Sequence, residues 1–410
     1  MIDKLLNIRH LRVFCEVART KSISKASENV FLSQPAMTQA IAKLEHLLET
    51  SLFQRKHEGM YLTDSGELLL VRVESAFKLL HEGLRDALKN IDNQRCNLLL
   101  NALTTTQLRA LVAMASARSI SEAGRNIGIA QSAIHRSIKE LEALLKIQLL
   151  EKTSTGINPG KAALILSRAS KLAFSEINQA CEEIASLHSR ETGHLQIGSM
   201  PLARTSVLPN TILHFSEQYP DFTISVVDGP YSDLLHHLRH ANIDLLIGAL
   251  RFPVPTDDVV QEAFFQSEVV IVARPDHPLM QRPVTMEDLI QASWVVPHQW
   301  TPTRAIFEQF FANANKPSPK RLVETSSQIL IRSLLEGSDR LTVTSSHQFQ
   351  RELDEGWLAI LPFRIRDAYR PIGISMRKGW RPTATQQAFI EMLRQQAGSV
   401  TGYHPHSDGE

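Results

Sequence analysis

The stretch LRVFCEVARTKSISKASENVFLSQPAMTQAIAKLEHLLETSLFQR, residues 11–55, occurs twice in this chain. The second copy, LRALVAMASARSISEAGRNIGIAQSAIHRSIKELEALLKIQLLEK, covers residues 108–152 and aligns without a gap at an offset of 97 positions. Several pairs that differ exchange one apolar residue for another, such as Phe14 and Leu111. A repeat of this length indicates a duplicated folding unit. We call residues 11–55 the first copy and residues 108–152 the second copy.

The first copy has the pattern of two short helices joined by a turn. Ser22 and Ser33 are suited to cap a helix N-terminus, and Pro35 suits the first turn of a helix because its missing N–H has no partner there. The second helix is expected over residues 34–48, and a basic hairpin around Arg55 follows it. This pattern predicts a helix-turn-helix followed by a wing.

Such a unit is suited to binding DNA. The exposed start of the second helix fits the major groove, where amide, hydroxyl and basic side chains meet base edges. Basic residues on the wing would lie against phosphates. In the other interpretation the unit is a helical interaction module whose polar face is solvated, but two such patterns in register favour the DNA-binding one.

Several motifs resemble the signature of LysR-type transcriptional regulators. They are Leu32-Ser33-Gln34-Pro35-Ala36, Leu44-Glu45, Leu52-Phe53, Arg55 and Leu62-Thr63-Asp64-Ser65-Gly66. The family commonly has an arginine at the position of Gln39. The resemblance implies that the DNA contacts of the first copy are Ser33, Gln34, Pro35, Thr38 and Gln39, with Arg55 on the wing.

The second copy keeps the apolar core and changes the surface. Residues 100–170 hold nine Lys and Arg against four Glu, a balance of +5, whereas residues 1–70 balance at +1. Because phosphate neutralisation supplies much of the affinity for DNA, this charge favours a second DNA-binding unit over a module that only packs. Pro159-Gly160-Lys161-Ala162-Ala163 replaces the Leu62–Gly66 motif, which leaves the second wing undecided. The corresponding DNA contacts would be Gln131, Ser132, His135, Arg136 and Lys152.

A long amphipathic helix is expected after each copy. LysR-type regulators have one such linker helix, which they use for dimerisation. Two of them leave two arrangements open: each copy carries its own pairing surface, or one helix packs within its own subunit. The two apolar seams are Val73, Phe77, Leu80, Leu84, Ala87 and Ile91, and then Leu166, Ala173, Ile177, Ala180, Ile184 and Leu187.

From residue 193 onward, strand and helix patterns alternate, which is typical of an α/β domain with a mostly parallel sheet. The region resembles the two-lobed effector domain of LysR-type regulators, which is similar to periplasmic solute-binding proteins. In such a domain a small anion or polar metabolite binds between the lobes, at strand ends and helix N-termini. Each candidate residue could equally be an ordinary helix cap. The candidates are Ser199, Met200, Thr205, Thr301, Thr303, Thr325 and Ser326.

Other classes of protein find little support in the sequence. Three cysteines far apart form no disulfide or metal pattern, and neither a signal peptide nor a membrane-spanning run is present. His236 and His240 could share a helix face, but no further ligand accompanies them at a useful spacing, so a solvated face is the expected interpretation. The sequence lacks nucleotide-binding and nucleophile motifs. We therefore expect a cytoplasmic protein without metal or cofactor that is not an enzyme.

The expected fold class is multidomain: two all-α winged helix-turn-helix domains with long linker helices, then a two-lobed α/β effector domain. The expected function is that of a sequence-specific transcriptional regulator under effector control. Its expected partners are double-stranded promoter DNA and a small effector, anionic by the helix-terminus argument. It would form a homodimer or homotetramer, with RNA polymerase as a further candidate partner and no membrane. The alternatives are a DNA-bridging architectural protein without ligand control and an enzyme fused to a DNA-binding domain.

The expected domains are 1–66 and 98–163 (winged helix-turn-helix), 67–97 and 164–192 (linker helices), 193–400 (effector domain, lobe I at 193–274 and 363–400, lobe II at 275–362) and 401–410 (tail).

Overall fold

The computed structural model describes residues 6–89, 91–117, 119–153, 156–188, 192–205, 207–366 and 368–399, without the side chains of residues 152–157, 202 and 204. The expected tail, residues 401–410, lies outside the described residues. The chain forms two compact units, Met1–Gly193 and His194–Glu410. Each unit has hydrophobic clusters of its own.

The first copy folds into three helices and a hairpin around one apolar core. Leu11, Phe14 and Leu44 are fully buried in it. The Ser22 and Ser33 side chains each accept a hydrogen bond from a backbone N–H three residues on, so both expected helix caps are confirmed. The elements are α1 (Ile8–Thr20), α2 (Ile23–Val30), α3 (Gln34–Leu48), β1 (Phe53–Lys56) and β2 (Gly59–Leu62).

The second copy forms the same elements, including the hairpin that the sequence left undecided. Gly160 N donates a hydrogen bond to the Leu149 carbonyl at 2.8 Å. In the first copy the equivalent bond joins Thr63 N to the Leu52 carbonyl at 3.0 Å. The backbone therefore closes the hairpin in both copies although the local motif differs. The elements are α6 (Thr105–Ser116), α7 (Ile120–Ile127), α8 (Gln131–Leu145), β3 (Leu150–Thr153) and β4 (Gly156–Pro159).

A helix that the sequence analysis missed, α5 (Asn93–Ala102), precedes the second copy. The preceding helix ends at Leu88, because Lys89 adopts a φ of 34° that leaves the helical region. The expected seam residue Ile91 therefore lies outside that helix. Asp92 then caps α5. A polar turn thus divides what the apolar spacing indicated as one continuous element.

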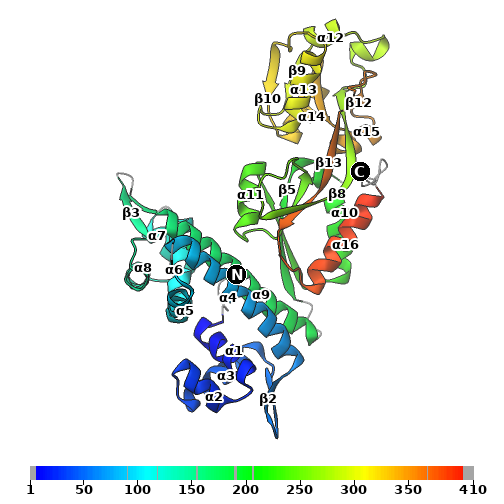
Figure 1. The fold of residues 1–410 in the computed structure, drawn as a ribbon. Helices are drawn as coiled ribbons and strands as arrows, with labels where there is room; N and C mark the ends of the chain where they lie inside the picture. Colours follow the sequence, from blue (N-terminus) through cyan, green and yellow to red (C-terminus); the bar gives the residue numbers. More distant parts are fainter. Residues whose placement is uncertain are drawn as a thin grey trace, which may run out of the picture. The chain divides into compact units, whose positions relative to one another are not determined.

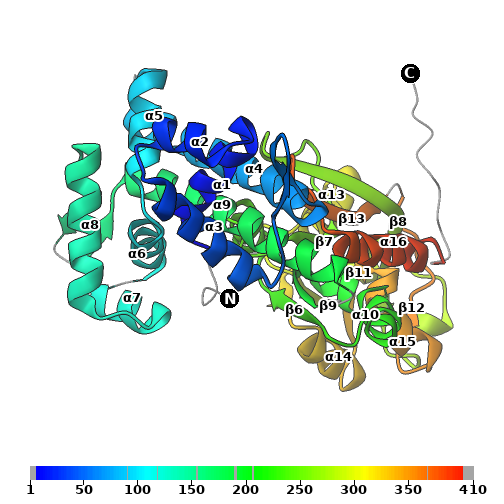
Figure 2. The ribbon, with the colours of Figure 1, turned by 90° about the horizontal axis from the view of Figure 1, so that it is seen from below.

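The two linker helices, α4 (Asp64–Leu88) and α9 (Lys161–Leu187), lie side by side in the same chain (Figures 1 and 2). They approach closely where Gly83 faces Ala169, since a Cβ on Gly83 would lie 2.3 Å from the Ala169 Cβ. Of the two arrangements left open, the structure therefore has packing within the subunit, and it involves both linker helices. The two linker helices pair with each other.

A buried polar cluster crosses this helix pair. The Arg72 Nε donates to Glu183 Oε2 at 3.0 Å, and Arg72 Nη1 donates to Glu176 Oε2 at 3.2 Å and to Gln179 Oε1 at 3.1 Å. Arg72 itself is 3% exposed. Burial alone would lower the Arg72 pKa, but the hydrogen bonds and negative charge of Glu183 and Glu176 raise it above its ordinary value. The cation therefore remains charged between the helices.

The C-terminal unit is built on one mixed sheet with the strand order β10-β9-β11-β8-β13-β7-β5-β6. Two long strands, β8 (Val259–Ala273) and β13 (Tyr369–Arg377), are antiparallel neighbours and connect its two lobes. The start of β8 pairs with β13 in the first lobe, whereas its end pairs with β11 and β12 in the second. Figure 1 shows both strands extending between the lobes.

Helices cover the faces of this sheet in both lobes. The first-lobe elements are β5 (Gly193–Ser199), η1 (Pro201–Arg204), α10 (Val207–Gln218), β6 (Phe222–Asp228), α11 (Tyr231–Arg239), β7 (Leu245–Ala249) and α16 (Ala384–Gly398). The second-lobe elements are η2 (Pro278–Gln281), α12 (Met286–Gln291), β9 (Ser293–Val296), α13 (Pro302–Asn313), β10 (Arg321–Glu324), α14 (Gln328–Glu336), β11 (Arg340–Ser345), η3 (Ser346–Phe349), α15 (Gln350–Asp354) and β12 (Ala359–Ile360).

The expectation of a mostly parallel sheet was wrong. The pairs β5–β7, β9–β10 and β9–β11 are parallel, but every pairing given for β8 and β13 is antiparallel. Strand alternation along the chain does not specify the direction in which distant strands pair, and here the lobe-crossing strands decide it. The short helices α12 and α15 were also not foreseen.

Replacement of Arg72 by methionine is expected to destabilise the N-terminal unit by about 3 kcal/mol, because two carboxylates would remain between the helices without their cation. Urea unfolding of the full chain, followed by helical circular dichroism, measures the change. Arg85→Met, at an exposed position of α4, is the matched control and should shift the midpoint little. Equal effects of the two substitutions would contradict the role given to the cluster.

Candidate nucleic-acid interface and effector site

The first turns of α3 present polar side chains to solvent. Gln34 is oriented by a hydrogen bond from its Nε2 to Ser24 Oγ at 3.2 Å, and Thr38 Oγ1 donates to the Gln34 carbonyl at 3.0 Å. The opposite face of the helix is anchored by the buried Met37 and Ile41. The predicted contacts of the first copy therefore share one exposed surface: Ser33, Gln34, Pro35, Thr38 and Gln39.

The start of α8 repeats this arrangement. Ser121 Oγ donates to Gln131 Oε1 at 3.0 Å, and these residues occupy the positions of Ser24 and Gln34. The serine that orients the glutamine was missed by the sequence analysis. Its signal was available, since the Ser-Ile-Ser run is identical in the two copies. The exposed predicted contacts of the second copy are Gln131, Ser132, His135 and Arg136.

The two helix starts differ in two respects. Ala130 stands where Ser33 caps α3, and alanine has no side-chain oxygen to cap a helix. Arg136 lies on the exposed face with its Nε 3.4 Å from Glu140 Oε1, a solvated pair that restrains it little. The predicted contact Lys152 is in β3, and its side chain lies outside the described part of the chain.

A glutamate joins α3 to the hairpin β1–β2, and its repeat equivalent joins α8 to the hairpin β3–β4. Glu45 Oε1 accepts a hydrogen bond from Leu52 N at 2.8 Å. Glu142 Oε1 accepts from Leu149 N at 2.9 Å and from Leu150 N at 3.2 Å. Because Glu142 and Leu149 are the repeat equivalents of Glu45 and Leu52, the helix and wing are joined in the same way in both copies.

The wing of the first copy carries more positive charge than its sequence alone suggests. Arg55 is exposed on β1, as predicted. The Lys56 and Lys21 ammonium groups lie 5.2 Å and 5.0 Å from the centre of the Tyr61 ring. Met60 N donates to the Lys21 carbonyl at 2.9 Å, which holds the hairpin against the end of α1. Lys21 was missed because only the folded hairpin brings it to this surface.

In the C-terminal unit, the three predicted effector residues near β5 have different surroundings. Ser199 is fully buried, and its Oγ donates to the next carbonyl at 3.4 Å. The backbone N–H of Met200 donates to the Ile247 carbonyl at 3.0 Å. Thr205 Oγ1 donates to the His347 carbonyl at 2.9 Å and so joins the two lobes.

The four predicted effector residues in the second lobe also differ in their surroundings. Thr301 caps α13, and Thr325 Oγ1 accepts a hydrogen bond from the backbone two residues on. Ser326 is exposed. Thr303, in contrast, is buried and accepts a hydrogen bond from Arg370 Nη1, which brings the start of α13 against β13.

Arg370 is a candidate site residue that the sequence analysis missed. It is 9% exposed, and its Nε has no hydrogen-bond partner among the described residues. Burial, and to a smaller extent the charge of nearby Arg251, lowers the Arg370 pKa to about 10. Arg251 also has its pKa lowered by burial, and its guanidinium lies 4.4 Å from the centre of the Tyr231 ring. The signal in the sequence was an arginine at the start of a strand whose centre is apolar.

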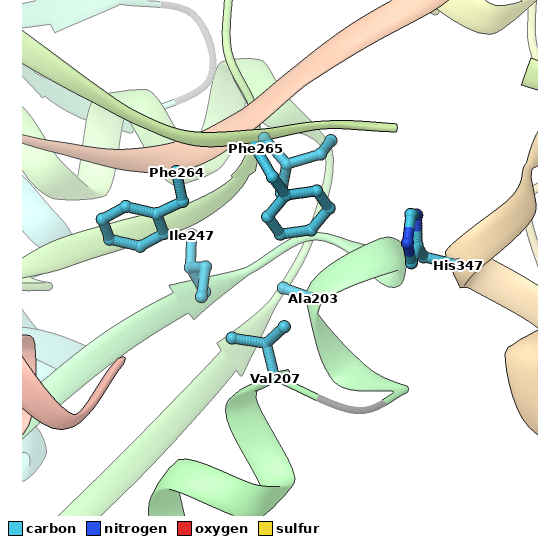
Figure 3. Close-up of a pocket in the computed structure, with 7 residues that line it drawn as sticks. Ala203, Val207, Ile247, Phe264, Phe265 and His347 are labelled. Atoms are coloured by element: carbon cyan, nitrogen blue, oxygen red, sulfur yellow. The ribbon is translucent and has the colours of Figure 1, made fainter. Parts of the chain in front are cut away.

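A small apolar cavity lies close to the bond between Thr205 and His347 (Figure 3). It encloses about 10 Å³, which is little more than the space of one water molecule. The His347 ring lies at its edge, 5.2 Å from the Phe265 ring. In this conformation the cavity is too small for a metabolite. Its lining residues are Ala203, Val207, Ile247, Phe264, Phe265, His347 and Ile372.

The described residues offer little to a metal ion or a membrane. They contain no group of three or more His, Cys, Asp or Glu side chains that could hold a metal ion. The His236 and His240 rings stack with their centres 3.9 Å apart. Among the described helices, none is by itself long and apolar enough to cross a membrane, although the bent pair α5 and α6 meets that test in length and composition.

Helix-turn-helix elements joined to a two-lobed α/β unit define a DNA-binding regulator under the control of a small molecule. Two family models match the chain. The LysR substrate binding domain matches residues 188–398, and the bacterial regulatory helix-turn-helix protein of the lysR family matches residues 8–67 and again 105–164. The chain belongs to the LysR family of transcriptional regulators. Its relatives are regulators, and it is not an enzyme.

Individual relatives agree with this assignment. The HTH-type transcriptional regulator GalR of Pseudomonas putida is 31% identical over 396 residues, which cover 96% of this chain and 98% of that protein. This alignment has to include both copies. PcaQ of Agrobacterium fabrum is 24% identical over 294 residues, covering 72% of this chain and 94% of its own. A full-length OxyR variant from Pseudomonas aeruginosa has a similar fold, with a TM-score of 0.54, 18% identity, and coverage of 75% of this chain and 99% of that one.

The link between α8 and its wing can be tested with Glu142→Gln. The substitution removes a charged acceptor for two backbone N–H groups and should lower the free energy of unfolding by about 1 kcal/mol. Amide exchange at Leu149 and Leu150, measured at neutral pH, should become faster. Glu140→Gln, at an exposed site on the same helix, is the control and should leave both rates unchanged.

The effect of this substitution should depend on pH. Burial tends to raise the Glu142 pKa, but the Lys139 ammonium and the two backbone N–H groups lower it below its ordinary value. Its stabilisation is therefore present above the ordinary glutamate pKa and is lost as the pH falls through the lowered value. The difference between wild type and Glu142→Gln should shrink in acid. A difference that stays constant down to strongly acidic pH would contradict this assignment.

Proposed function

We propose that both copies are winged helix-turn-helix domains that bind double-stranded promoter DNA. The observation that carries this proposal is the repetition of two side-chain arrangements, the glutamine held by a serine at the helix start and the glutamate that ties the helix to its wing. A module kept only for packing has no use for an exposed, oriented glutamine. The basic balance of the second copy and its exposed Arg136 supply favourable interactions with phosphate.

The same proposal places the protein in the cytoplasm as a homodimer or homotetramer, with RNA polymerase as a candidate partner. The alternative of a DNA-bridging protein without ligand control finds no support in the C-terminal unit. That unit matches a substrate-binding family over nearly its whole length. An enzymatic role is set aside by the relatives, which are regulators.

We infer that the effector is an anion, with a carboxylate as the simplest case, and that it binds between the lobes at Arg370 and Thr303. A buried guanidinium with an unused N–H is costly unless a partner satisfies it. Ser345 and Thr344, at the end of β11, also have buried hydroxyl oxygens without a partner among the described residues. In the first turn of α13, Pro302 has no N–H and the Arg304 N–H is capped by Thr301, so the N–H of Thr303 is the one that can favour negative charge there.

DNA binding by the second copy can be tested with Arg136→Glu in the full chain. Reversal of charge at the start of α8 should remove part of the footprint on a bound promoter and reduce the dependence of affinity on salt. Lys146→Glu makes the same reversal at the opposite, exposed end of α8 and is the matched control. A footprint and salt slope that are the same for both variants and wild type would show that the second copy does not touch DNA.

The effector site can be tested by thermal-shift screening of the full chain against a panel of mono- and dicarboxylates. A binding anion should raise the melting temperature, since it stabilises the native state in proportion to its occupancy. Arg370→Met should abolish the shift, whereas Arg366→Met, an exposed neighbour, should keep it. A shift that survives Arg370→Met, or an equal shift with the neutral amides of the same carboxylates, would overturn the assignment.

A further inference from the structure

The pairing of α4 with α9 is antiparallel. Arg72, near the start of α4, meets Glu176 and Glu183 in the second half of α9. Gly83, near the end of α4, meets Ala169 in the first half of α9. Residue numbers therefore fall along one helix as they rise along the other.

This pairing is also symmetric with respect to the repeat. At the offset of 97 positions, Ala169 is the equivalent of Arg72, and Ala180 is the equivalent of Gly83. The Gly83 contact is with Ala169, while the Arg72 contacts surround Ala180 on α9. Gly83 therefore contacts the repeat equivalent of Arg72, and Arg72 contacts the surroundings of the repeat equivalent of Gly83. Such reciprocal contacts are the signature of a two-fold, isologous interface.

A second contact supports the two-fold relation. Ile8 N donates to Thr105 Oγ1 at 2.9 Å, and residues 8 and 105 are repeat equivalents. Equivalent residues meet each other only close to a two-fold axis. The N-terminal unit therefore contains within one chain the kind of symmetric pair that two identical chains would otherwise form.

The antiparallel pair determines where the two copies lie. Each hairpin leads directly into the N-terminus of its own linker helix, so the two copies are attached at opposite ends of the pair (Figure 1). With a rise of 1.5 Å per residue, these ends are on the order of 40 Å apart. One turn of DNA separates equivalent major-groove positions by roughly 34–36 Å. Two copies attached to the spacer at this separation suit one face of a single duplex.

The two recognition surfaces are related by symmetry in backbone but not in chemistry. Gln34 and Gln131 are the same, whereas the neighbouring exposed positions differ. A symmetric pair of DNA-binding domains with identical surfaces selects two identical inverted half-sites, because the DNA mirrors the symmetry of the protein. Unlike surfaces select unlike half-sites. The differing pairs are Pro35 and Ser132, Thr38 and His135, and Gln39 and Arg136.

The charges between the helices favour pairing of α4 with α9 over pairing of two α9 helices. In an α9–α9 pair of the same register, Ala169 would take the place of Arg72. Glu176, Gln179 and Glu183 would then lose the cation that they share. The link through α5 and the second copy also keeps α9 at a high effective concentration near its own α4.

We propose that a single chain recognises one composite DNA site with two inverted, unlike half-sites about one helical turn apart. The first copy reads one half and the second copy reads the other, with α4 and α9 as the spacer. The proposal rests on the proposed function, because it requires the second copy to bind DNA.

The first experiment selects binding sites for the full chain from random duplex DNA. The selected site is then rebuilt in three forms: as found, with the first half-site duplicated in inverted orientation, and with the second half-site duplicated likewise. The composite site should bind best, and each symmetrised site should bind at least about tenfold more weakly. Two identical half-sites in the selected DNA would overturn the inference and leave DNA binding intact. Selection of DNA with only one half-site would instead refute DNA binding by the second copy. The absence of any sequence preference would refute the proposed function.

A variant with converted specificity sharpens the test. Ser132→Pro, His135→Thr and Arg136→Gln together give the second copy the first copy's residues at these three positions, all of which are on the surface. This chain should now prefer the site with the first half-site duplicated. The matched control is Lys146→Gln, which also removes one charge from α8 and should keep the composite preference. An unchanged preference in the triple variant would contradict the assignment of half-sites to copies.

Pairing within the chain is tested by co-expression of two disabled variants. One carries Gln34→Ala with Arg55→Ala, and the other carries Gln131→Ala with Arg136→Ala. If α4 pairs with α9 of its own chain, the mixture should bind the composite site no better than either variant alone. Recovery of binding in the mixture would show that α4 of one chain pairs with α9 of another, and would overturn the single-chain site.

Discussion

The N-terminal unit depends on one buried cation. Arg72 is surrounded by Glu176, Gln179 and Glu183, all from the opposite helix. A charge removed from water is tolerated only where its partners are in place, so the cluster selects one register of α4 on α9. The close approach of Gly83 to Ala169 selects the same register through packing. Because each hairpin continues directly into one of these helices, that register also determines the distance and orientation between the two surfaces that we propose to bind DNA.

The C-terminal unit contains the opposite case. Arg370 is nearly as inaccessible as Arg72, yet a threonine hydroxyl is its hydrogen-bond partner, and no ion pair is found for it among the described residues. The comparison separates two uses of a buried guanidinium. Where carboxylates of the protein surround it, the cation holds elements together. Where they do not, the missing negative charge is the natural contribution of a ligand. The cavity beside His347 encloses only about 10 Å³, so a metabolite could enter that cavity only if its walls moved apart.

Local signals explain which parts of the fold the sequence could predict. The predicted range of α3, residues 34–48, agrees with the structure because a serine cap, a proline in the first turn and regular apolar spacing all lie within that segment. The LysR assignment came from equally local motifs, and the family matches confirm it.

Features that depend on distant contacts could not be predicted in this way. A heptad seam indicates that a helix pairs but does not identify the partner helix. The pairing of α4 with α9 was therefore left open. The break before α5 was hidden because the apolar spacing continued across it. Strand direction in the sheet was misjudged for the same reason. Arg370 escaped notice because its burial follows from the packing of α13 against β13, and the predicted effector residues have yet to be tested.

The duplication changes how recognition can evolve. In a pair of identical chains, every substitution on the recognition surface is made twice, and both halves of the DNA contact change together. Here Gln39 and Arg136 are encoded at separate places in one gene, although they occupy equivalent places in the fold. A substitution at either one alters a single half of the interface and leaves the other half to retain the DNA. Such a chain can acquire a new target sequence in two successive steps, with a partly bound intermediate between them.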